Sequence, residues 1–261
     1  MSEIMSGKTV VVTGASSGIG ANVTEQLLNA GATVIGLDRA SESSASQHIT
    51  VDLSDESSID RTIAAIEGPI DGLCNIAGVS GNAGADLTMR VNFLGLRALT
   101  EGLAPRIERG GAIVNIASIA GSRWAERTRE HVSLARTTTF SDGLKWLEAN
   151  PIQDDTAYSY SKEAVVVWSR ILTTRLLSAG VRVNAVSPGP VETPILTQFR
   201  EVFGHDHVQE DITRVGRPGT PADVAPVVVW LCSDGSRWVN GADIAADGGL
   251  AATFAPGSEK N

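Results

Sequence analysis

The chain has 261 residues, 42% of them hydrophobic, which suits one globular domain with a full core. Acidic residues outnumber basic ones by 30 to 21, and the net charge of -9 argues against nucleic acid or an anionic membrane as a partner. The apolar runs 164–168 and 226–232 are far shorter than the roughly 20 residues that cross a bilayer, and the first residues lack the order of a signal peptide. We expect a single domain, residues 1–261, in the cytoplasm.

The cysteines and histidines do not form a pattern of metal ligands. Cys74 and Cys232 each lie in apolar sequence, which is typical of buried thiols rather than of a disulfide or a metal pair. The four histidines show no ligand spacing, and the segment 205–207 (His-Asp-His) has the polarity of a loop. We therefore expect no metal site.

Short β-branched runs alternate with helical stretches along the chain. Strands are expected at 9–13, 32–37, 48–51, 71–78, 112–118, 181–189 and 242–249. Helices are expected from Gly18, after Ser54, near 86–109, through 158–177, and from Thr220, a good N-cap with Pro221 at the first helical position. Strands that are apolar on both faces, with helices between them, indicate a parallel sheet covered on both sides. The sequence thus predicts an α/β, doubly wound, Rossmann-type single domain.

The first strand leads into a glycine-rich turn, TGASSGIG, at 13–20. Glycines at such a turn let the backbone approach a pyrophosphate at the positive end of the next helix. The turn also matches the G-x-S-x-G elbow of a hydrolase, but only one strand precedes Ser16, whereas that fold needs earlier strands. No Lys-Ser/Thr follows, which excludes a Walker loop, while a glycine turn needed only for helix packing stays open. The candidate cofactor residues here are Gly14, Ser16, Ser17, Gly18, Ile19 and Gly20.

A carboxylate follows about 20 residues later, where the second strand ends. Asp38 is placed to accept both hydroxyls of an adenosine ribose, and its charge would repel the 2'-phosphate of NADP, so NAD is the expected cofactor. Arg39 beside it either binds a phosphate or is a solvated surface residue. At the next strand end, Asp52 and Leu53 either meet the adenine edge or, for Asp52, cap the following helix.

Both tyrosines of the chain lie in YSYSK, residues 158–162. On a helix, Tyr158 and Lys162 are four residues apart and share a face, while Tyr160 points elsewhere. The pair is either an aromatic ring packed on a lysine stem or an acid/base pair. The pentapeptide alone leaves both open.

Taken in order, the motifs TGASSGIG, Asp38, NIAG (75–78), RVNFLG with Asn92, NIASIAG with Ser118, Tyr158 with Lys162, and SPGPVET (187–193) resemble the short-chain dehydrogenase/reductase family along nearly the whole chain. The resemblance implies strand order 3-2-1-4-5-6-7 and a site at the carboxyl ends of the strands. It implies catalytic roles for Asn92, Ser118, Tyr158 and Lys162. The further cofactor contacts that it implies, beside Tyr158 and Lys162 themselves, are Asn75, Ala77, Gly78, Pro188, Gly189, Val191 and Thr193.

The resemblance also assigns a role to each catalytic residue. Tyr158 exchanges a proton with an alcohol or carbonyl oxygen while hydride passes to or from nicotinamide, and nearby positive charge is expected to lower the pKa of its phenol. Ser118 holds the substrate oxygen, and Lys162 binds the nicotinamide ribose. Asn92 holds a water that relays the proton; without the resemblance, an asparagine inside a helix would indicate a kink or a local backbone bond.

Two features depart from the common family pattern. Ile76 replaces a second asparagine, which the small residues after it should tolerate. Residues 120–155 form an insertion between Ser118 and Tyr158, in which Ser141 and Asp142 are expected to cap a short helix. The insertion and the DGGLA ending resemble the subgroup of coniferyl-alcohol and bacterial 3α-hydroxysteroid dehydrogenases. The resemblance implies a homo-oligomer, usually a tetramer. An insertion at this place would obstruct the packing of that tetramer, so we expect a homodimer.

The substrate cover is expected at about 194–215. The apolar residues of this segment suit a bulky apolar or aromatic alcohol, and they fit an ordinary amphipathic helix equally well; they are Ile195, Leu196, Phe199, Val202 and Phe203. The favoured substrate is a coniferyl-type allylic alcohol, with a 3α-hydroxysteroid or another carbonyl compound as the alternative. A regulator that binds NAD(H) without turnover is the alternative from another class.

Overall fold

The computed structural model describes residues 4–254, apart from the side chains of Arg200, Val202 and Phe203. Its centre is a seven-stranded sheet in the order β3-β2-β1-β4-β5-β6-β7, and every pairing in it is parallel. This confirms the predicted strand order. The strands are β1 (Thr9–Thr13), β2 (Thr33–Asp38), β3 (Gln47–Thr50), β4 (Ile70–Asn75), β5 (Ile107–Ile116), β6 (Arg182–Pro188) and β7 (Asp243–Ala246).

The central strands are apolar on both faces because each face has its own core. On β1, Val11 packs into one core, and its neighbours Val10 and Val12 pack into the other. Its neighbour in the sheet, β4, also contributes to both cores, with Leu73 in the first core and Cys74 in the second. Side chains alternate across a strand, so a run such as VVV supplies both cores at once.

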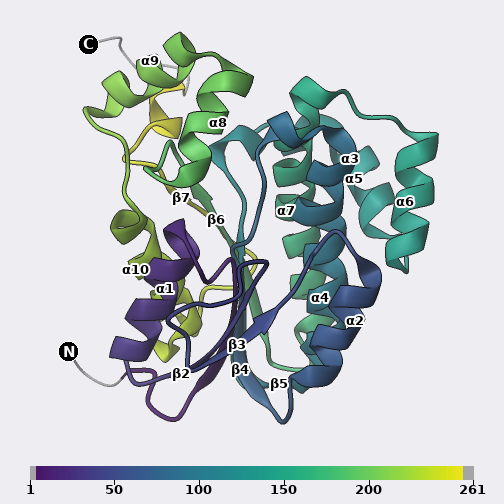
Figure 1. Cartoon of the computed structure of the whole chain (residues 1–261), viewed down its shortest axis with the longest axis vertical. Helices are drawn as coiled ribbons and strands as arrows, with labels where there is room; N and C mark the ends of the chain where they lie inside the picture. Colours follow the sequence, from purple (N-terminus) through teal and green to yellow (C-terminus); the bar gives the residue numbers. More distant parts are fainter. Residues whose placement is uncertain (1–3, 255–261) are drawn as a thin grey trace.

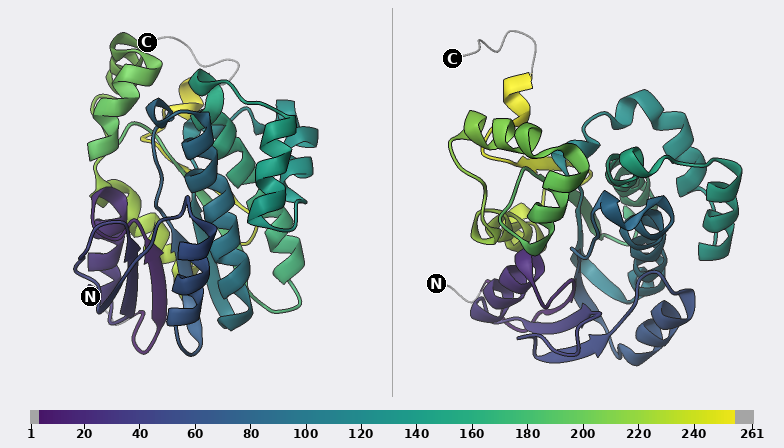
Figure 2. Two further views of the ribbon diagram at one scale, coloured as in Figure 1. Left: turned by 45° about the vertical axis from the view of Figure 1, so that its right-hand side comes forward. Right: turned by 45° about the horizontal axis from the view of Figure 1, so that its top comes forward.

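Helices cover both faces of the sheet (Figures 1 and 2). One face carries α1 (Gly18–Asn29) and α10 (Pro221–Cys232), which pack against each other. The other carries α2 (Glu56–Ala65), α4 (Leu96–Leu103) and α7 (Asp154–Leu176). The start of α10 confirms the predicted cap. Thr220 is the N-cap, and its amide donates to Asp223 Oδ2 at 2.7 Å.

The segment predicted as one helix near 86–109 is broken into several elements. It contains α3 (Ala85–Met89), a π-helical stretch (Arg90–Gly95) and α4, and β5 then begins at Ile107 rather than at 112. A glycine pair at 110–111 hid the early start of this strand, because glycine is a poor strand former. In the structure, Ile107 is nonetheless buried and paired with Ile70 across an irregularity in the ladder.

Residues 120–155 form ordered structure at the outer side of α7, on the right of Figure 1. They contain α5 (Thr128–Ala135) and α6 (Phe140–Ala149). The predicted cap of α6 is wrong: the cap is Thr139, whose Oγ1 accepts from the Asp142 amide at 3.0 Å, so the helix starts earlier than Ser141. The buried Arg97 on α4 holds the segment between the two helices by donating to Leu134 O and Thr139 O.

The predicted cover at 194–215 consists of two helices, α8 (Pro194–Phe203) and α9 (His205–Val215), above the carboxyl end of the sheet. Gly204, with φ of 88°, joins them. They pack through a small apolar cluster of Leu196, Val208 and Ile212. The His-Asp-His segment opens α9, so its prediction as a loop was wrong. The side chains of Val202 and Phe203 lie outside the described residues.

The two cysteines are buried free thiols, as predicted, with 3.3 Å between Cys74 Sγ and Cys232 Sγ. The hydrogen bond with Cys232, together with burial, raises the pKa of the Cys74 thiol well above its usual value. Within residues 4–254 no helix has the length and apolarity to cross a bilayer. The same residues contain no group of three or more potential metal ligands.

Candidate active site

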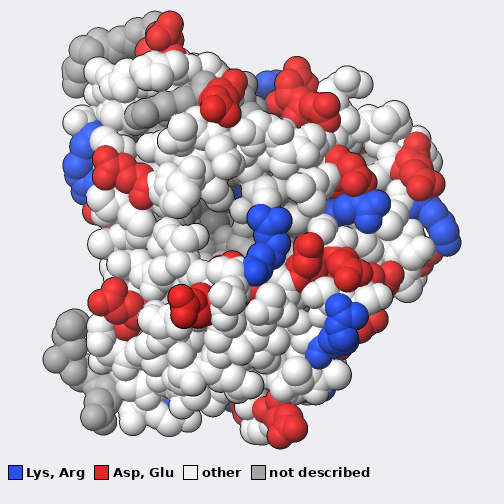
Figure 3. All heavy atoms as spheres, in the orientation of Figure 1, with Lys and Arg blue, Asp and Glu red and all other residues white. Residues whose placement is uncertain are grey.

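A cavity of about 340 Å³ opens at the carboxyl ends of β1 and β4. These strands are neighbours in the sheet although β2 and β3 lie between them in the chain, and such a reversal of strand order creates a crevice. Figure 3 shows a hollow near the centre of the face it draws, with acidic and basic side chains interspersed around it. The predicted residues that line the cavity are Gly14, Ser17, Gly18, Ile19, Gly20, Asp38, Arg39, Asp52, Leu53, Ala77, Gly78, Ser118, Tyr158, Lys162, Pro188, Gly189, Val191 and Thr193.

The glycine-rich turn is shaped by close backbone contacts. A Cβ on Gly20 would lie 2.0 Å from Gly14 O, so no larger residue fits there. Gly14 has φ of 70°, and a Cβ on it would lie 3.0 Å from the backbone of Ala77. The following helix α1 starts at Gly18, and its N-cap, Ser17, makes no side-chain cap. The positive end of α1 therefore faces the cavity with backbone amides available to an anion.

Asp38 lies at the end of β2, on the wall of the cavity. Its Oδ2 accepts from the Ser16 amide and its Oδ1 from the Ala40 amide, each at 3.0 Å, which fixes the carboxylate beside the glycine turn. Arg39 lines the same wall. Ser16 does not line the cavity, because its hydroxyl turns away and donates to Glu42 O at 2.6 Å.

Asp52 and Leu53 lie on the cavity wall, and their contact with the adenine edge stays a prediction. Asp52 does not cap α2. Its Oδ1 accepts from the amide and the hydroxyl of Ser54, and these bonds lower the pKa of Asp52. The cap of α2 is Asp55, which accepts from the Ser57 amide at 3.0 Å.

Ser118, Tyr158 and Lys162 converge at the inner end of the cavity. Tyr158 and Lys162 share one face of α7, and their residues are only 7% and 4% exposed. The Tyr158 phenol is hydrogen-bonded to Ser118, which follows the end of β5. Lys162 Nζ lies 5.7 Å from the centre of the Tyr158 ring and donates to Ile116 O at 2.9 Å. The structure thus brings together a phenol, a hydroxyl and an ammonium.

Burial has the largest effect on the pKa values of Tyr158 and Lys162. It raises the pKa of Tyr158 to about 12, and the Ser118 hydrogen bond offsets only part of that rise. Burial also lowers the pKa of Lys162 to about 8, because a buried ammonium loses its hydration. The expected lowering of the Tyr158 pKa is therefore not a property of the chain without its ligands.

Asn92 lies in the π-helical stretch and is fully buried. Its Oδ1 accepts from the Val79 amide at 2.8 Å, and its Nδ2 donates to Val79 O and to Ser161 Oγ. A Cβ on Gly78 would lie 3.2 Å from Asn92 Oδ1 and 3.6 Å from Lys162 Nζ, so these three residues are packed together. Asn92 thus fixes the backbone beside Lys162.

Asn75 is a buried structural residue and does not line the cavity. Its Nδ2 donates to Thr100 Oγ1 and to Asn115 Oδ1, both at 2.8 Å. These bonds tie the end of β4 to α4 and β5. Asn75 therefore supports the cavity wall from behind.

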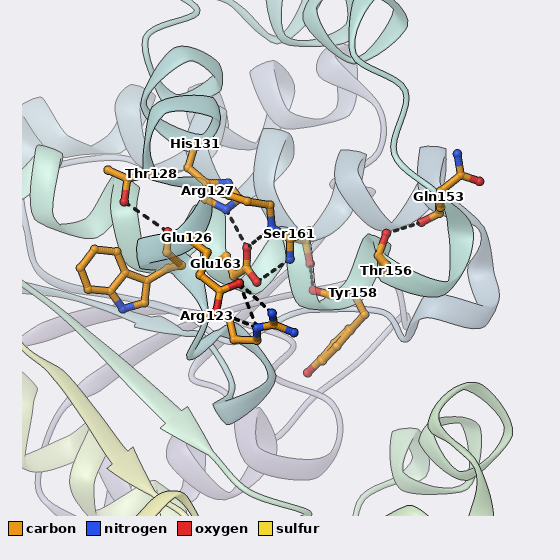
Figure 4. Close-up of polar contacts among 11 residues, drawn as sticks. Arg123, Glu126, Arg127, Thr128, His131, Gln153, Thr156, Tyr158, Ser161 and Glu163 are labelled. Atoms are coloured by element: carbon orange, nitrogen blue, oxygen red, sulfur yellow. Dashed lines mark hydrogen bonds and ion pairs between the residues drawn. The ribbon is translucent and has the colours of Figure 1, made fainter. Parts of the chain in front are cut away.

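Tyr160 lies on the opposite face of α7, as predicted. Its ring packs against His131 of α5, with 4.4 Å between the ring centres. On this face the buried Glu163 accepts hydrogen bonds from Arg127 and lies 2.8 Å from His131 Nε2 (Figure 4). Burial raises the pKa of Glu163, but the bonds from His131 and Arg127 outweigh it and leave the pKa below its usual value. Figure 4 shows Tyr158 pointing away from this cluster.

A second cavity, of about 260 Å³, adjoins the first at Ser118 and Tyr158. Phe199 of α8 lines both cavities, and its ring centre lies 4.7 Å from that of Tyr158. Gln198 of the same helix lines the first cavity and is hydrogen-bonded to Ser80 at 2.7 Å. The predicted cover therefore lies over Tyr158.

Sequence reasoning missed several residues that line these cavities, among them Gln198, His207, Asp211 and Phe254. Gln198 carries no pattern that would have singled it out. His207 and Asp211 are four residues apart on α9 and both line the second cavity. Their spacing indicates a shared face only on a helix, whereas the sequence predicts a loop at 205–207. Phe254, near the end of the described chain, also lines it.

A doubly wound sheet with a glycine cradle and a buried Ser-Tyr-Lys group at one crevice defines a class of nucleotide-binding oxidoreductases. Comparison with known proteins agrees. A family profile described as short chain dehydrogenase matches residues 8–128, and one described as enoyl-(acyl carrier protein) reductase matches residues 147–251. The chain belongs to the short-chain dehydrogenase family and is an oxidoreductase.

Three similar proteins span nearly the whole chain. A coniferyl-alcohol dehydrogenase of Pseudomonas sp. strain HR199 is 44% identical, over 96% of this chain and 99% of that protein. A 2-(R)-hydroxypropyl-CoM dehydrogenase of Xanthobacter autotrophicus is 31% identical, over 94% and 99%. The crystal structure of the 3-alpha-hydroxysteroid dehydrogenase from Pseudomonas sp. B-0831, complexed with NADH, is 31% identical with a TM-score of 0.82, over 97% and 100%.

Proposed function

We propose that this protein is an NAD(H)-dependent dehydrogenase that interconverts a bulky apolar or aromatic alcohol, such as a coniferyl-type allylic alcohol, and its carbonyl product. The observation that carries the proposal is the buried Tyr158–Ser118 hydrogen bond with Lys162 beside it, at the junction of the two cavities. The similarity to a coniferyl-alcohol dehydrogenase favours this substrate class over a 3α-hydroxysteroid.

The residues of the first cavity fit NAD. In the turn from Gly14 to Gly20, a Cβ on Gly20 would lie 2.0 Å from Gly14 O, so the backbone is in direct contact there. The backbone amides and the end of α1 would then bind a pyrophosphate. Asp38 offers a carboxylate for the two ribose hydroxyls. Asp52 and Leu53 lie where the adenine would be held, and the segment from Pro188 to Thr193 lies at the other end. The cavity therefore matches both ends of a dinucleotide.

The remaining chemistry belongs to the chain's own side chains. Ser118 Oγ holds the substrate oxygen near Tyr158, whose phenolate takes the hydroxyl proton during oxidation and returns it during reduction. Lys162, through its charge and its place within 6 Å of the ring, favours the phenolate. NAD, when bound, accepts the hydride from the carbinol carbon or returns it as NADH. Asn92 fixes the backbone beside Lys162, and its relay of a proton through water stays a prediction.

The test is a panel of substrates, and the measured quantity is the absorbance of the nicotinamide. Aryl-allylic alcohols, 3-hydroxysteroids and simple secondary alcohols are incubated separately with the protein and NAD. We expect the aryl-allylic alcohols to have the highest kcat/KM. A preference for the steroids would favour the alternative substrate, and NADH binding without any turnover would favour a regulator that only binds the dinucleotide.

Removing the Asp38 carboxylate is expected to weaken NAD binding about 10-fold to 100-fold while NADP binding changes little, because hydrogen bonds to a charged group contribute about 1.5–3 kcal/mol. Paired titrations of the Asp38→Ala variant with both dinucleotides measure this change. Asp38→Asn is the companion variant, since an amide keeps the shape of the side chain but not its charge. An unchanged ratio of the two affinities would overturn the assignment of NAD.

A further inference from the structure

The second cavity is lined by both polar and apolar residues. Ser118 and Tyr158, which also line the first cavity, supply polar atoms. Residues from five segments of the chain form the apolar part of the wall: Ile119, Ala120, Pro190, Leu196, Phe199, Val208 and Phe254. A substrate whose oxygen reaches Tyr158 would therefore have its carbon skeleton held by apolar side chains.

One more polar pair lines the same cavity, on helix α9. Asp211 and His207 are one turn apart, with 3.9 Å between Asp211 Oδ2 and His207 Nε2. The Asp211 side chain is 15% exposed, whereas that of His207 is 62% exposed. The carboxylate is thus largely withdrawn from water, and the imidazole lies at the outside.

Among the residues that the structure describes, none donates a hydrogen bond to the Asp211 carboxylate. Its separation from His207 is too long for a hydrogen bond, and no hydrogen bond joins it to any other residue in the described part of the chain. Asp211 lies in the second half of α9 and so cannot cap the start of that helix. The Asp211 carboxylate lines the cavity and is little exposed, so a ligand in the cavity that donates a hydrogen bond would meet an acceptor free of other described donors.

We propose that Asp211, with His207 beside it, binds a hydroxyl group at the end of the substrate remote from the reacting carbon. This inference rests on the proposed function. A carboxylate only accepts hydrogen bonds, so the remote group must be a donor such as a phenol or an alcohol, and an ether or ketone does not satisfy it. The preferred substrate is then an alcohol with a flat apolar body and a second hydroxyl at its far end.

The experiment compares two alcohols that differ by one hydroxyl, 4-hydroxycinnamyl alcohol and cinnamyl alcohol, with NAD. In the parent protein, kcat/KM is expected to be about 10-fold to 100-fold higher for the hydroxylated alcohol, the factor that a hydrogen bond to a charged group provides. In Asp211→Ala this advantage should disappear, because kcat/KM falls for the hydroxylated alcohol and stays within about twofold for cinnamyl alcohol. Glu210→Ala, an exposed acid on the same helix, should behave as the parent does.

Two results would overturn the inference. If Asp211→Ala lowers kcat/KM equally for both alcohols, Asp211 has a structural role; if it changes neither, it does not contact the substrate. NADH affinity, measured in parallel, separates misfolding from either result.

A second readout does not depend on turnover. The affinities of 4-hydroxycinnamaldehyde and cinnamaldehyde for the complex with NADH are measured by calorimetry in the parent and in Asp211→Ala. A preference for the hydroxylated aldehyde that is lost in the variant supports the inference even if the panel shows no oxidation, which would count against the proposed function alone. Equal affinities in the parent overturn the inference.

Discussion

The Tyr158→Phe variant is expected to lose about 10³-fold in kcat while its NADH dissociation constant stays close to that of the parent. General acid/base catalysis contributes about 10²-fold to 10⁴-fold, and the phenol is the group that the structure places against Ser118 at the junction of the cavities. The ring of phenylalanine fills the same space, so its contact with Phe199 and the packing of α7 should be kept. Steady-state kinetics and NADH titration measure the two quantities.

The chain supplies its own control for this substitution. Tyr160, two residues away on the same helix, is buried, and its hydroxyl has no hydrogen-bond partner among the described residues. Tyr160→Phe therefore removes the same atom without removing a contact, and its kcat should match that of the parent. If both variants retained near-parental rates, Tyr158 would have no role as the acid or base.

The second large effect is expected on stability, from Glu163→Gln. Glu163 is 1% exposed and binds both Arg127 and His131, and removal of one member of a buried ionic group typically costs about 3–5 kcal/mol. We expect a loss near the lower end, about 3 kcal/mol, because the Arg127 side chain is 34% exposed and can reach water. Urea unfolding at neutral pH measures the change in the free energy of unfolding.

The pH dependence of that difference gives its cause. The pKa of Glu163 is lowered in the folded protein from an ordinary value of 4.5, so its contribution is complete above that value and disappears as the pH falls through the lowered pKa. The parent and Glu163→Gln should therefore converge in stability at acid pH. Glu126→Gln, which breaks only the exposed pair with Arg123 in the same region, should leave stability unchanged at every pH. A constant gap between the parent and Glu163→Gln would exclude the carboxylate charge as its origin.

The fold and most of the site were predictable because the information is local. Runs such as 9–13 are apolar on both faces only if helices cover both sides of the sheet, and the positions of the glycines in the first turn follow from contacts within a few residues. The pairing of Tyr158 with Lys162 follows from the helical repeat alone. The other motif residues follow strand ends, and α7 brings Tyr158 and Lys162 to the same crevice.

The errors have a different origin, since they depend on contacts between distant segments. The early start of β5 at Ile107 depends on its pairing with Ile70, which overrides the glycines that follow. Helix α5 was missed because it is held by Glu163 and by packing on α7, not by strong local signals. Ser16 and Asn75 do not line the cavity, and their side chains bond within the protein, so their predicted contacts with the cofactor stay predictions. The proposed dimer and the cytoplasmic location stay predictions.

The burial of α7 has a consequence for amide hydrogen exchange. Every side chain from 160 to 169 is buried, because the sheet lies on one side of the helix and α5 on the other. Amides in such a segment exchange only when the whole molecule unfolds, whereas α8 and α9, which meet in a cluster of three apolar residues, belong to the segments that open locally. Deuterium uptake should therefore be slow around Tyr158 and fast in the helices that cover it. Such a pattern would mean that α8 and α9 can open to admit a ligand while Ser118, Tyr158 and Lys162 stay in place.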